Sequence, residues 1–227
     1  MSCPSECVVI NLPERTDRRA DMEVQLRRVG WDAKFFPAIR PHERGEFPTV
    51  GSKGCFLSHL AVLKAARDQQ ARRLIILEDD LNFANDFVAR WTRYMNQLEN
   101  SPWSILYPGH LLNTAPSGLN LLDPSTPVQT THFMVIHANA IPRIVEGFET
   151  ILSRPAGHPL GGPMHVDGAY STIRAQNVDL RTYCISPALG YQRPSRTDIA
   201  DLKWFDRITA VRPFVNAARR AKSVIFR

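Results

Sequence analysis

Short apolar runs alternate with segments of helical periodicity along this chain, and the alternation limits its fold more than any other feature. Runs rich in β-branched or aromatic residues predict buried strands over 7–12, 35–36, 74–77, 103–107, 128–136 and 181–185. Apolar residues at helical spacing predict helices over 16–30, 52–68 and 86–98, and a short helix after Asn139. We expect Thr16 and Asn139 to be N-caps. Strands that alternate with helices indicate a single α/β domain with a mostly parallel, mixed sheet flanked by helices.

The length and the charge of the chain restrict its organisation and its partners. A chain of 227 residues suits one sizeable α/β domain, which we expect over 1–202, followed by a basic, partly amphipathic tail over 203–227. Lys and Arg exceed Asp and Glu by 28 − 22 = 6, which favours anionic partners. A basic amphipathic segment lies on an anionic membrane or packs on its own domain. No aromatic platform or helix-turn-helix pattern is present, so we expect no nucleic-acid partner.

The start of the chain and its cysteines bear on its location. Residues 1–6 lack the positive start and the apolar stretch of a secretory signal, and no apolar run approaches the roughly 20 residues that cross a bilayer. We expect a cytoplasmic protein, which a membrane-binding tail would bring to the inner membrane face; a tail that packs on its own domain is the slightly favoured alternative. Cys55 and Cys184 each sit inside an apolar stretch, and we expect them to be small buried hydrophobes.

Three adjacent carboxylates, Glu78, Asp79 and Asp80, directly follow the apolar run over 74–77. Like charges side by side repel one another, and a divalent cation between them would offset the repulsion. Mg²⁺ and Mn²⁺ take oxygen ligands and bridge protein carboxylates to the phosphates of a ligand. Ligands also tend to bind at the carboxyl ends of strands in open α/β sheets. The cluster therefore predicts a site for Mn²⁺ or Mg²⁺, with a solvated turn as the alternative.

A receiver-like signalling domain with a Mg²⁺-dependent phosphoacceptor is the alternative function for the same cluster. Receivers place an acidic pair after a strand, beside an Asp that is phosphorylated, and Asp123 stands 123 − 79 = 44 residues beyond Asp79. In receivers, however, the acidic pair ends the first strand, whereas 77 residues precede Glu78 here. A receiver also needs a downstream Lys, and only Lys203 and Lys222 follow the cluster. These two differences weigh against the receiver.

Several motifs of the chain resemble those of glycosyltransferase family 25, which includes bacterial lipopolysaccharide galactosyltransferases and collagen galactosyltransferases. Three of them are VINLPERTDRR over 9–19, GCFLSH over 54–59 and ILEDD over 76–80. HVDGAYS over 165–171, and Gln192 with Thr197, Asp198 and Ile199, resemble later segments of that family. The resemblance follows the same order over about residues 7–199.

The resemblance implies a GT-A-type fold, a UDP-sugar donor that is most often UDP-galactose, Mn²⁺ or Mg²⁺, and inversion at the anomeric carbon. In that scheme Glu78, Asp79 and Asp80 hold the metal. Glu78 and Asp80 are the preferred ligands because alternate positions beyond a strand point the same way. A metal there would stabilise the charge that builds on the departing nucleoside diphosphate. The implied acceptor is a glycan or a lipid-linked glycan of lipopolysaccharide or surface polysaccharide synthesis.

The resemblance and the residue types also predict donor contacts and a base. The predicted donor-binding residues are Asn11, Arg15, Arg18, Arg19, Ser58, His59 and Asp198. Arginines suit phosphates, although a solvated helix face explains them as well, and His59 equally suits a buried hydrogen bond. Inverting transfer needs a base that removes the acceptor's proton. We expect Asp167 to be that base, with a helix cap as its alternative role.

Overall fold

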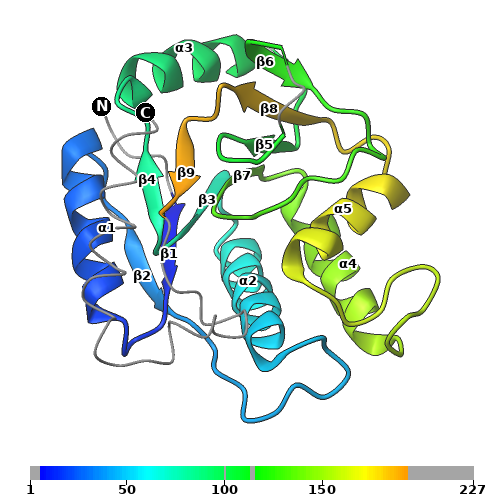
Figure 1. Ribbon diagram of the computed structural model, residues 1–227. Coiled ribbons are helices and arrows are strands. Elements are labelled where there is room, and N and C mark those ends of the chain that lie inside the picture. The colour runs from blue at the N-terminus through cyan, green and yellow to red at the C-terminus, as the bar shows by residue number, and fades with distance from the viewer. Residues whose placement is uncertain (1–5, 100, 113–115, 194–227) are drawn as a thin grey trace.

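The structure, a computed structural model, describes residues 6–99, 101–112 and 116–193, and its centre is a seven-stranded sheet (Figure 1). The strands follow the order β2-β1-β3-β7-β5-β8-β6. Their bounds are β1 Glu6–Asn11, β2 Lys34–Pro37, β3 Arg73–Glu78, β5 Ile105–Tyr107, β6 Gly118–Leu121, β7 Phe133–His137 and β8 Thr182–Ser186. A separate antiparallel pair joins β4 (Leu81–Phe83) to β9 (Gly190–Gln192).

The sheet is mixed, as the sequence predicts. β2, β1 and β3 are parallel neighbours, and β5 is parallel to β8. β7 is antiparallel to β3 and to β5, and β6 is antiparallel to β8. Among the described strands of this sheet, five therefore run one way and β7 and β6 run the other. The predicted α/β class and the flanking helices are confirmed. β6 and β7 follow the preceding strand through segments whose described residues form no helix.

Five helices in the described residues cover the two faces of the sheet (Figure 1). They are α1 (Thr16–Val29), α2 (Val50–Asp68), α3 (Phe87–Glu99), α4 (Ile141–Ser153) and α5 (Val166–Gln176). α2, α4 and α5 pack on the face that carries Leu74 and Ile76 of β3. α1 and α3 pack on the opposite face, which carries Ile75 and Leu77. Successive side chains of a strand point to opposite faces, so the continuous run LIIL of β3 is buried on both sides.

The ends of the helices differ in part from the sequence prediction. Thr16 is the first residue of α1, not its N-cap, and Arg15 precedes it without a side-chain cap. Ala140, not Asn139, precedes α4. α2 begins at Val50 because Thr49 caps it: the Thr49 hydroxyl accepts a hydrogen bond from the Ser52 amide at 2.9 Å. None of the helices in the described residues combines the length and the apolarity that crossing a membrane requires.

Candidate functional site

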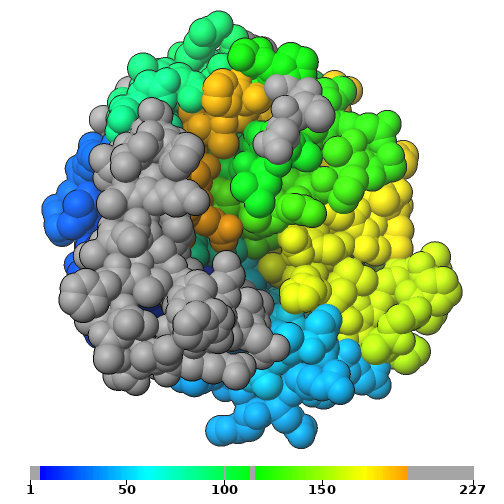
Figure 2. Space-filling model, viewed as in Figure 1, coloured from blue at the N-terminus to red at the C-terminus, as the bar shows by residue number. Residues whose placement is uncertain are grey.

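A cleft of about 870 Å³ lies at the carboxyl ends of the parallel strands β1, β2 and β3. Its lining residues are Ile10, Leu12, Glu14, Arg15 and Arg18; Ala38, Ile39, Arg40 and Pro41; Val50, Gly51, Gly54, Cys55 and Ser58; Glu78, Asp79 and Asp80; Leu111; and Tyr191, Gln192 and Arg193. Figure 2 shows segments near α2, α5 and β9 converging around a depression on this side of the molecule. The cleft therefore occupies the place where open α/β sheets bind ligands.

Asp79 is already paired with protein groups. It lies in the turn between β3 and β4 and is 6% exposed. Its Oδ2 accepts a hydrogen bond from Nδ2 of Asn11 at 2.7 Å, and its Oδ1 accepts one from Nη1 of Arg18 at 2.9 Å. Both carboxylate oxygens are thus occupied, and the charge of Asp79 is balanced by Arg18 of α1. The repulsion within the acidic triple is therefore offset at Asp79 by the protein itself.

Asp80 is less well compensated. Its Oδ2 is 3.7 Å from Nη1 of Arg18, and its Oδ1 is buried without a hydrogen-bond partner in the described residues. Burial, and then the negative charge of Glu78, raise the pKa of Asp80 to about 7, against the influence of Arg18. A buried carboxylate oxygen that lacks a donor is costly, so this position favours a cation.

Glu78 ends β3 and faces three polar side chains. The Thr131 hydroxyl donates a hydrogen bond to its Oε1 at 2.6 Å, and Nε2 of Gln192 donates to its Oε2 at 3.4 Å. Nε2 of His59 lies 3.8 Å from Oε1. Burial acts to raise the pKa of Glu78, but His59 and then Thr131 outweigh it and hold that pKa below its usual value. Glu78 is therefore an ionised carboxylate at neutral pH.

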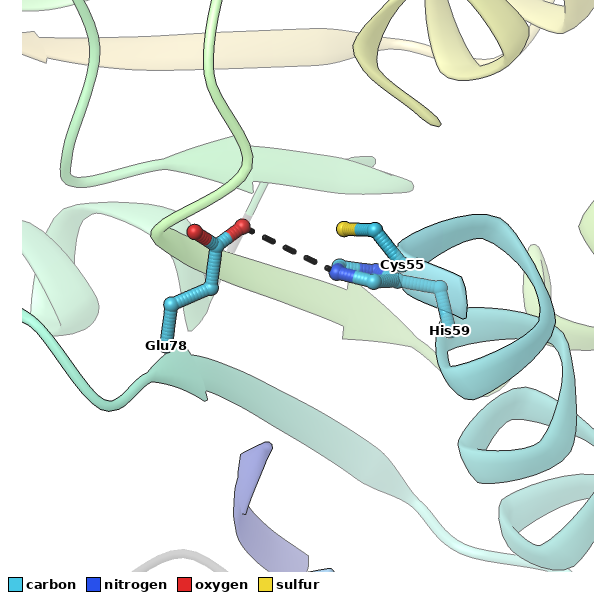
Figure 3. Close-up of side chains that lie close together, drawn as sticks. All are labelled: Cys55, His59 and Glu78. Carbon is cyan, nitrogen blue, oxygen red and sulfur yellow. Dashed lines mark ion pairs between the residues drawn. The ribbon is translucent and has the colours of Figure 1, made fainter. Parts of the chain in front are cut away.

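Cys55, His59 and Glu78 form a cluster that sequence reasoning missed. One ligand atom of each lies within 4.8 Å of the other two. Figure 3 shows Cys55 and His59 pointing from α2 toward Glu78 at the end of β3. Burial, followed by the charges of Glu78, Asp167, Asp80 and Asp79, raises the pKa of the Cys55 thiol well above its usual value. The available signal was the spacing, because residues four apart share one face of a helix.

Arg193 supports the acidic turn from the far end of the described chain. Its backbone amide donates to the carbonyl oxygen of Asp80 at 2.7 Å. Its Nη2 donates to the carbonyl oxygen of Asp79 at 2.6 Å, and its Nη1 donates to Oδ1 of Asn82 at 3.2 Å. Sequence reasoning did not predict this residue, because only the pairing of β9 with β4 brings it to the turn.

The predicted donor-binding residues take several positions. Arg15, Arg18 and Ser58 line the cleft. The Ser58 hydroxyl donates to the carbonyl oxygen of Gly54 and accepts from the Ile39 amide, so it ties the cleft wall to α2. Asp198 lies outside the described residues, as do Thr197, Ile199 and the predicted tail over 203–227.

Three other predicted donor residues are not in the cleft lining. Asn11 is buried, and its amide donates to Asp79 and to the carbonyl oxygen of Arg15. The guanidinium of Arg19 lies 4.3 Å from the centre of the Phe35 ring and pairs with Glu23, and half of its side chain is exposed. His59 is fully buried, and its Nδ1 lies 3.2 Å from the Tyr170 hydroxyl. Asn11 contacts the cleft through Asp79, and the donor-binding role of these three residues stays a prediction.

Asp167, the predicted base, stands in the first turn of α5. Its Oδ1 accepts from the Gly168 amide at 2.8 Å, and its Oδ2 accepts from the Thr130 amide at 3.4 Å. It is outside the cleft lining, but its charge helps to raise the pKa of Cys55, which lines the cleft. These contacts fit both a structural role and a base beside the cleft, so the role of Asp167 stays a prediction.

The fold argues against the receiver-like alternative. Asp123 follows β6, and β7, β5 and β8 separate β6 from β3 in the sheet. Four strand spacings amount to about 19 Å. The Oδ1 of Asp123 accepts hydrogen bonds from the amide and hydroxyl of Ser125, which lower the pKa of Asp123. A phosphoacceptor must lie beside the acidic pair, and Asp123 does not.

Comparisons with known proteins match mainly the first half of the chain. Residues 5–115 match the model of the family described as "Glycosyltransferase family 25 (LPS biosynthesis protein)". "Procollagen galactosyltransferase 2" of Mus musculus is 27% identical over an alignment of 127 residues, and the match covers 46% of this chain and 20% of that protein. "Putative glycosyltransferase R655" of Acanthamoeba polyphaga mimivirus is 35% identical over an alignment of 115 residues, and the match covers 44% of this chain and 36% of that protein. The chain thus matches about a fifth to a third of the length of these relatives.

A solved structure described as a glycosyltransferase involved in glycosylation of the major capsid of PBCV-1 aligns with 86% of this chain and 95% of its own, at 13% identity and a TM-score of 0.45. The family match includes β1, α1, α2, β3 and the acidic triple, which together form most of the cleft. Residues 5–115, which carry these elements, therefore match glycosyltransferase family 25.

Proposed function

We propose that this chain is a metal-dependent, inverting glycosyltransferase that moves a sugar from a UDP-sugar to a glycan acceptor, with galactose as the proposed sugar. The observation that carries the proposal is the combination of acidic and basic side chains that line the cleft. Oδ1 of Asp80, which has no hydrogen-bond partner in the described residues, and the ionised Glu78 share the lining of the cleft with Arg15 and Arg18. Carboxylates and guanidinium groups together suit a cation and a diphosphate in one cleft.

The acidic residues fit a hard divalent cation. Asp80 and Glu78 would hold Mn²⁺ or Mg²⁺, because each offers a carboxylate oxygen toward the cleft. Asp79 would act instead as an anchor, since Asn11 and Arg18 occupy both of its oxygens. When bound, such an ion supplies positive charge to the diphosphate oxygens, where negative charge develops as the glycosidic bond breaks.

Two further walls of the cleft suit the remaining parts of a sugar nucleotide. Arg15 and Arg18 line the side formed by β1 and α1, and guanidinium groups bind phosphate oxygens bidentately. Ile39, Pro41 and Val50 form an apolar side, against which a nucleobase would rest. The donor would therefore lie with its base toward the 38–41 loop and its diphosphate toward the acidic turn.

The acceptor would approach from the side of α5. Asp167 is our proposed base, and its charge acts on Cys55 at the edge of the cleft. It would accept the proton of the attacking hydroxyl. We further propose that the acceptor is a glycan or lipid-linked glycan of lipopolysaccharide or surface polysaccharide synthesis, used in the cytoplasm at the inner membrane face. The net charge of +6 supports an anionic surface as partner.

Calorimetry of UDP binding, with and without Mn²⁺, tests this function directly. The intact chain should bind UDP with Mn²⁺ at least about tenfold more tightly than UDP with chelator, which is a difference of about 1.4 kcal/mol. Asp80→Asn should remove the dependence on Mn²⁺, whereas Asp68→Asn, an exposed acid at the end of α2, should keep it. A screen of UDP-sugars for Mn²⁺-dependent hydrolysis then identifies the sugar. Absence of UDP binding by the intact chain refutes the proposal.

A further inference from the structure

The spacing of Cys55, His59 and Glu78 suits a tetrahedral transition metal. Zinc takes thiolate sulfur at about 2.3 Å and imidazole nitrogen or carboxylate oxygen at about 2.0–2.2 Å. Tetrahedral angles with those bonds place ligand atoms about 3.3–3.6 Å apart. Nε2 of His59 and Oε1 of Glu78 are 3.8 Å apart, and all three ligand atoms lie within 4.8 Å of one another. Small side-chain rotations would complete the site.

A second and independent observation is the state of His59. Its ring is fully buried, and its Nε2 has no hydrogen-bond partner in the described residues. Its other nitrogen, Nδ1, lies 3.2 Å from the hydroxyl of buried Tyr170. When Nδ1 donates to Tyr170, the lone pair of Nε2 faces the space between Glu78 and Cys55 (Figure 3). A ligating histidine is usually held by such a bond at its second nitrogen.

Glu78 is held in the same manner. The Thr131 hydroxyl donates to its Oε1 and fixes the carboxylate, as outer partners of metal ligands do. Its Oε1 faces His59, whereas its Oε2 faces Gln192 at the cleft wall. Glu78 therefore has one oxygen for this cluster and another for the ion at Asp80.

The ligand types distinguish this cluster from the acidic turn. A sulfur and an imidazole nitrogen favour zinc-class ions, whereas carboxylates alone favour Mg²⁺ or Mn²⁺. Cys55 and Glu78 also line the cleft, so a fourth position would be open to water or a ligand. Three protein ligands with one open position are typical of reactive rather than purely structural zinc sites.

We propose that Cys55, His59 and Glu78 bind one zinc-class ion at the edge of the cleft, separate from the ion of the proposed glycosyl transfer. The site goes beyond that function and shares only Glu78 with it. The i, i+4 pair on α2 and the end of β3 supply all three protein ligands.

The experiment uses the full chain, stripped with chelator and titrated with Co²⁺ and then with Zn²⁺. Co²⁺ should bind one to one and give a thiolate-to-cobalt absorption band, which Zn²⁺ displaces. Cys55→Ser should remove the band and lower Zn²⁺ affinity by at least about 100-fold, and His59→Gln by at least about tenfold. Cys184→Ala, at a buried cysteine of β8, and Cys3→Ser should retain the cobalt band and the wild-type Zn²⁺ affinity. Far-UV circular dichroism confirms that the variants are folded.

Two outcomes overturn the site. The first is the absence of a thiolate band in the intact chain, and the second is an unchanged band in Cys55→Ser. Neither depends on whether His59→Gln folds. Asp80→Asn separates this proposal from the proposed function, because it should abolish Mn²⁺-dependent UDP binding and keep the cobalt band. Loss of the band in Asp80→Asn means that the thiolate is not at a separate site, and also counts against the proposal.

Discussion

The Nη1 atom of Arg18 lies 2.9 Å from Oδ1 of Asp79, and both side chains are almost buried, at 12% and 8% exposure. This pair joins α1 to the turn that follows β3. It places one positive charge among three carboxylates. The hydrogen bond of this arginine goes to Asp79, so Glu78 and Asp80 keep more of their negative charge uncompensated.

Arg18→Gln should therefore destabilise the fold. Removing one partner of a buried pair leaves an uncompensated charge, which costs roughly 3 kcal/mol or more. Urea unfolding of the chelator-treated chain measures the change. Arg19→Gln is the matched control, because Arg19 is half exposed and contacts Glu23 on its own helix and the ring of Phe35, so the loss should stay within about 1 kcal/mol. Equal losses of unfolding free energy in the two variants would show that the buried Arg18–Asp79 pair stabilises the fold no more than the exposed Arg19–Glu23 pair does.

Stability should fall with rising pH in the absence of metal, because of Asp80. The folded chain holds the pKa of Asp80 at about 7, above its ordinary value of 3.8. The folded state thus binds this proton more tightly, and the free energy of unfolding declines between about pH 4 and pH 7. The decline should amount to roughly 3 kcal/mol.

Asp80→Asn removes that titration, so at pH 8 it should be more stable than the wild-type chain in chelator. Urea unfolding from pH 4.5 to pH 8 measures the difference between the two proteins. Asp86→Asn, at an exposed carboxylate that pairs with Arg90, should follow the wild-type curve. A constant difference between Asp80→Asn and wild type across this range would contradict the raised pKa.

Asp167→Asn tests the proposed base. The amide cannot accept a proton, so transfer should fall by about 10²- to 10⁴-fold, while UDP binding with Mn²⁺ stays within about twofold. Asp179→Asn, which breaks an exposed pair with Arg143, should leave both unchanged. Steady-state transfer rates and calorimetry give the two readouts. Turnover at the wild-type rate in Asp167→Asn would remove this residue from the base role.

Gly54→Ala should distort the cleft wall. A Cβ at Gly54 would lie 2.5 Å from the carbonyl oxygen of Ile39 and 3.2 Å from Cδ of Pro41, and the backbone atom cannot move without shifting the loop. Overpacking of this kind costs about 1–3 kcal/mol, and UDP binding should weaken as the loop moves. Gly168→Ala meets only the flexible side chain of Met164 and should be neutral or slightly stabilising. Thermal unfolding and calorimetry compare the two; equal effects would exclude a role of the close approach.

The sequence predicted elements with a strong pattern and missed those that depend on partners. The run over 74–77 and the helices α1, α2 and α3 appear nearly where their periodicity predicts. The predicted strand over 128–136 begins only at Phe133, because Thr130 adopts a positive φ of 72° that breaks an extended backbone. β9 has three residues and no apolar run, and it forms because β4 pairs with it.

The candidate site divides in the same way. The acidic triple and Arg18 were predictable, because they follow apolar strands in the order of known motifs. The hydrogen bonds of Thr131, Gln192 and Arg193 to the acidic turn were not, because they join positions 53 to 114 residues apart. Cys55 was expected to be a small buried hydrophobe, yet it is partly exposed at the cleft.

The hydrogen bonds of Arg193 to the turn of Asp79 and Asp80 have a consequence for the order of folding. Closing a contact across so long a stretch of chain is entropically costly and is expected late in folding. A nascent chain that has emerged only as far as residue 115 would carry the three motifs over 9–19, 54–59 and 76–80 without a finished cleft. The cleft would be complete only once β9 has paired with β4, and hydrogen exchange at the amides of the acidic turn, in chains ended before and after β9, would detect this step.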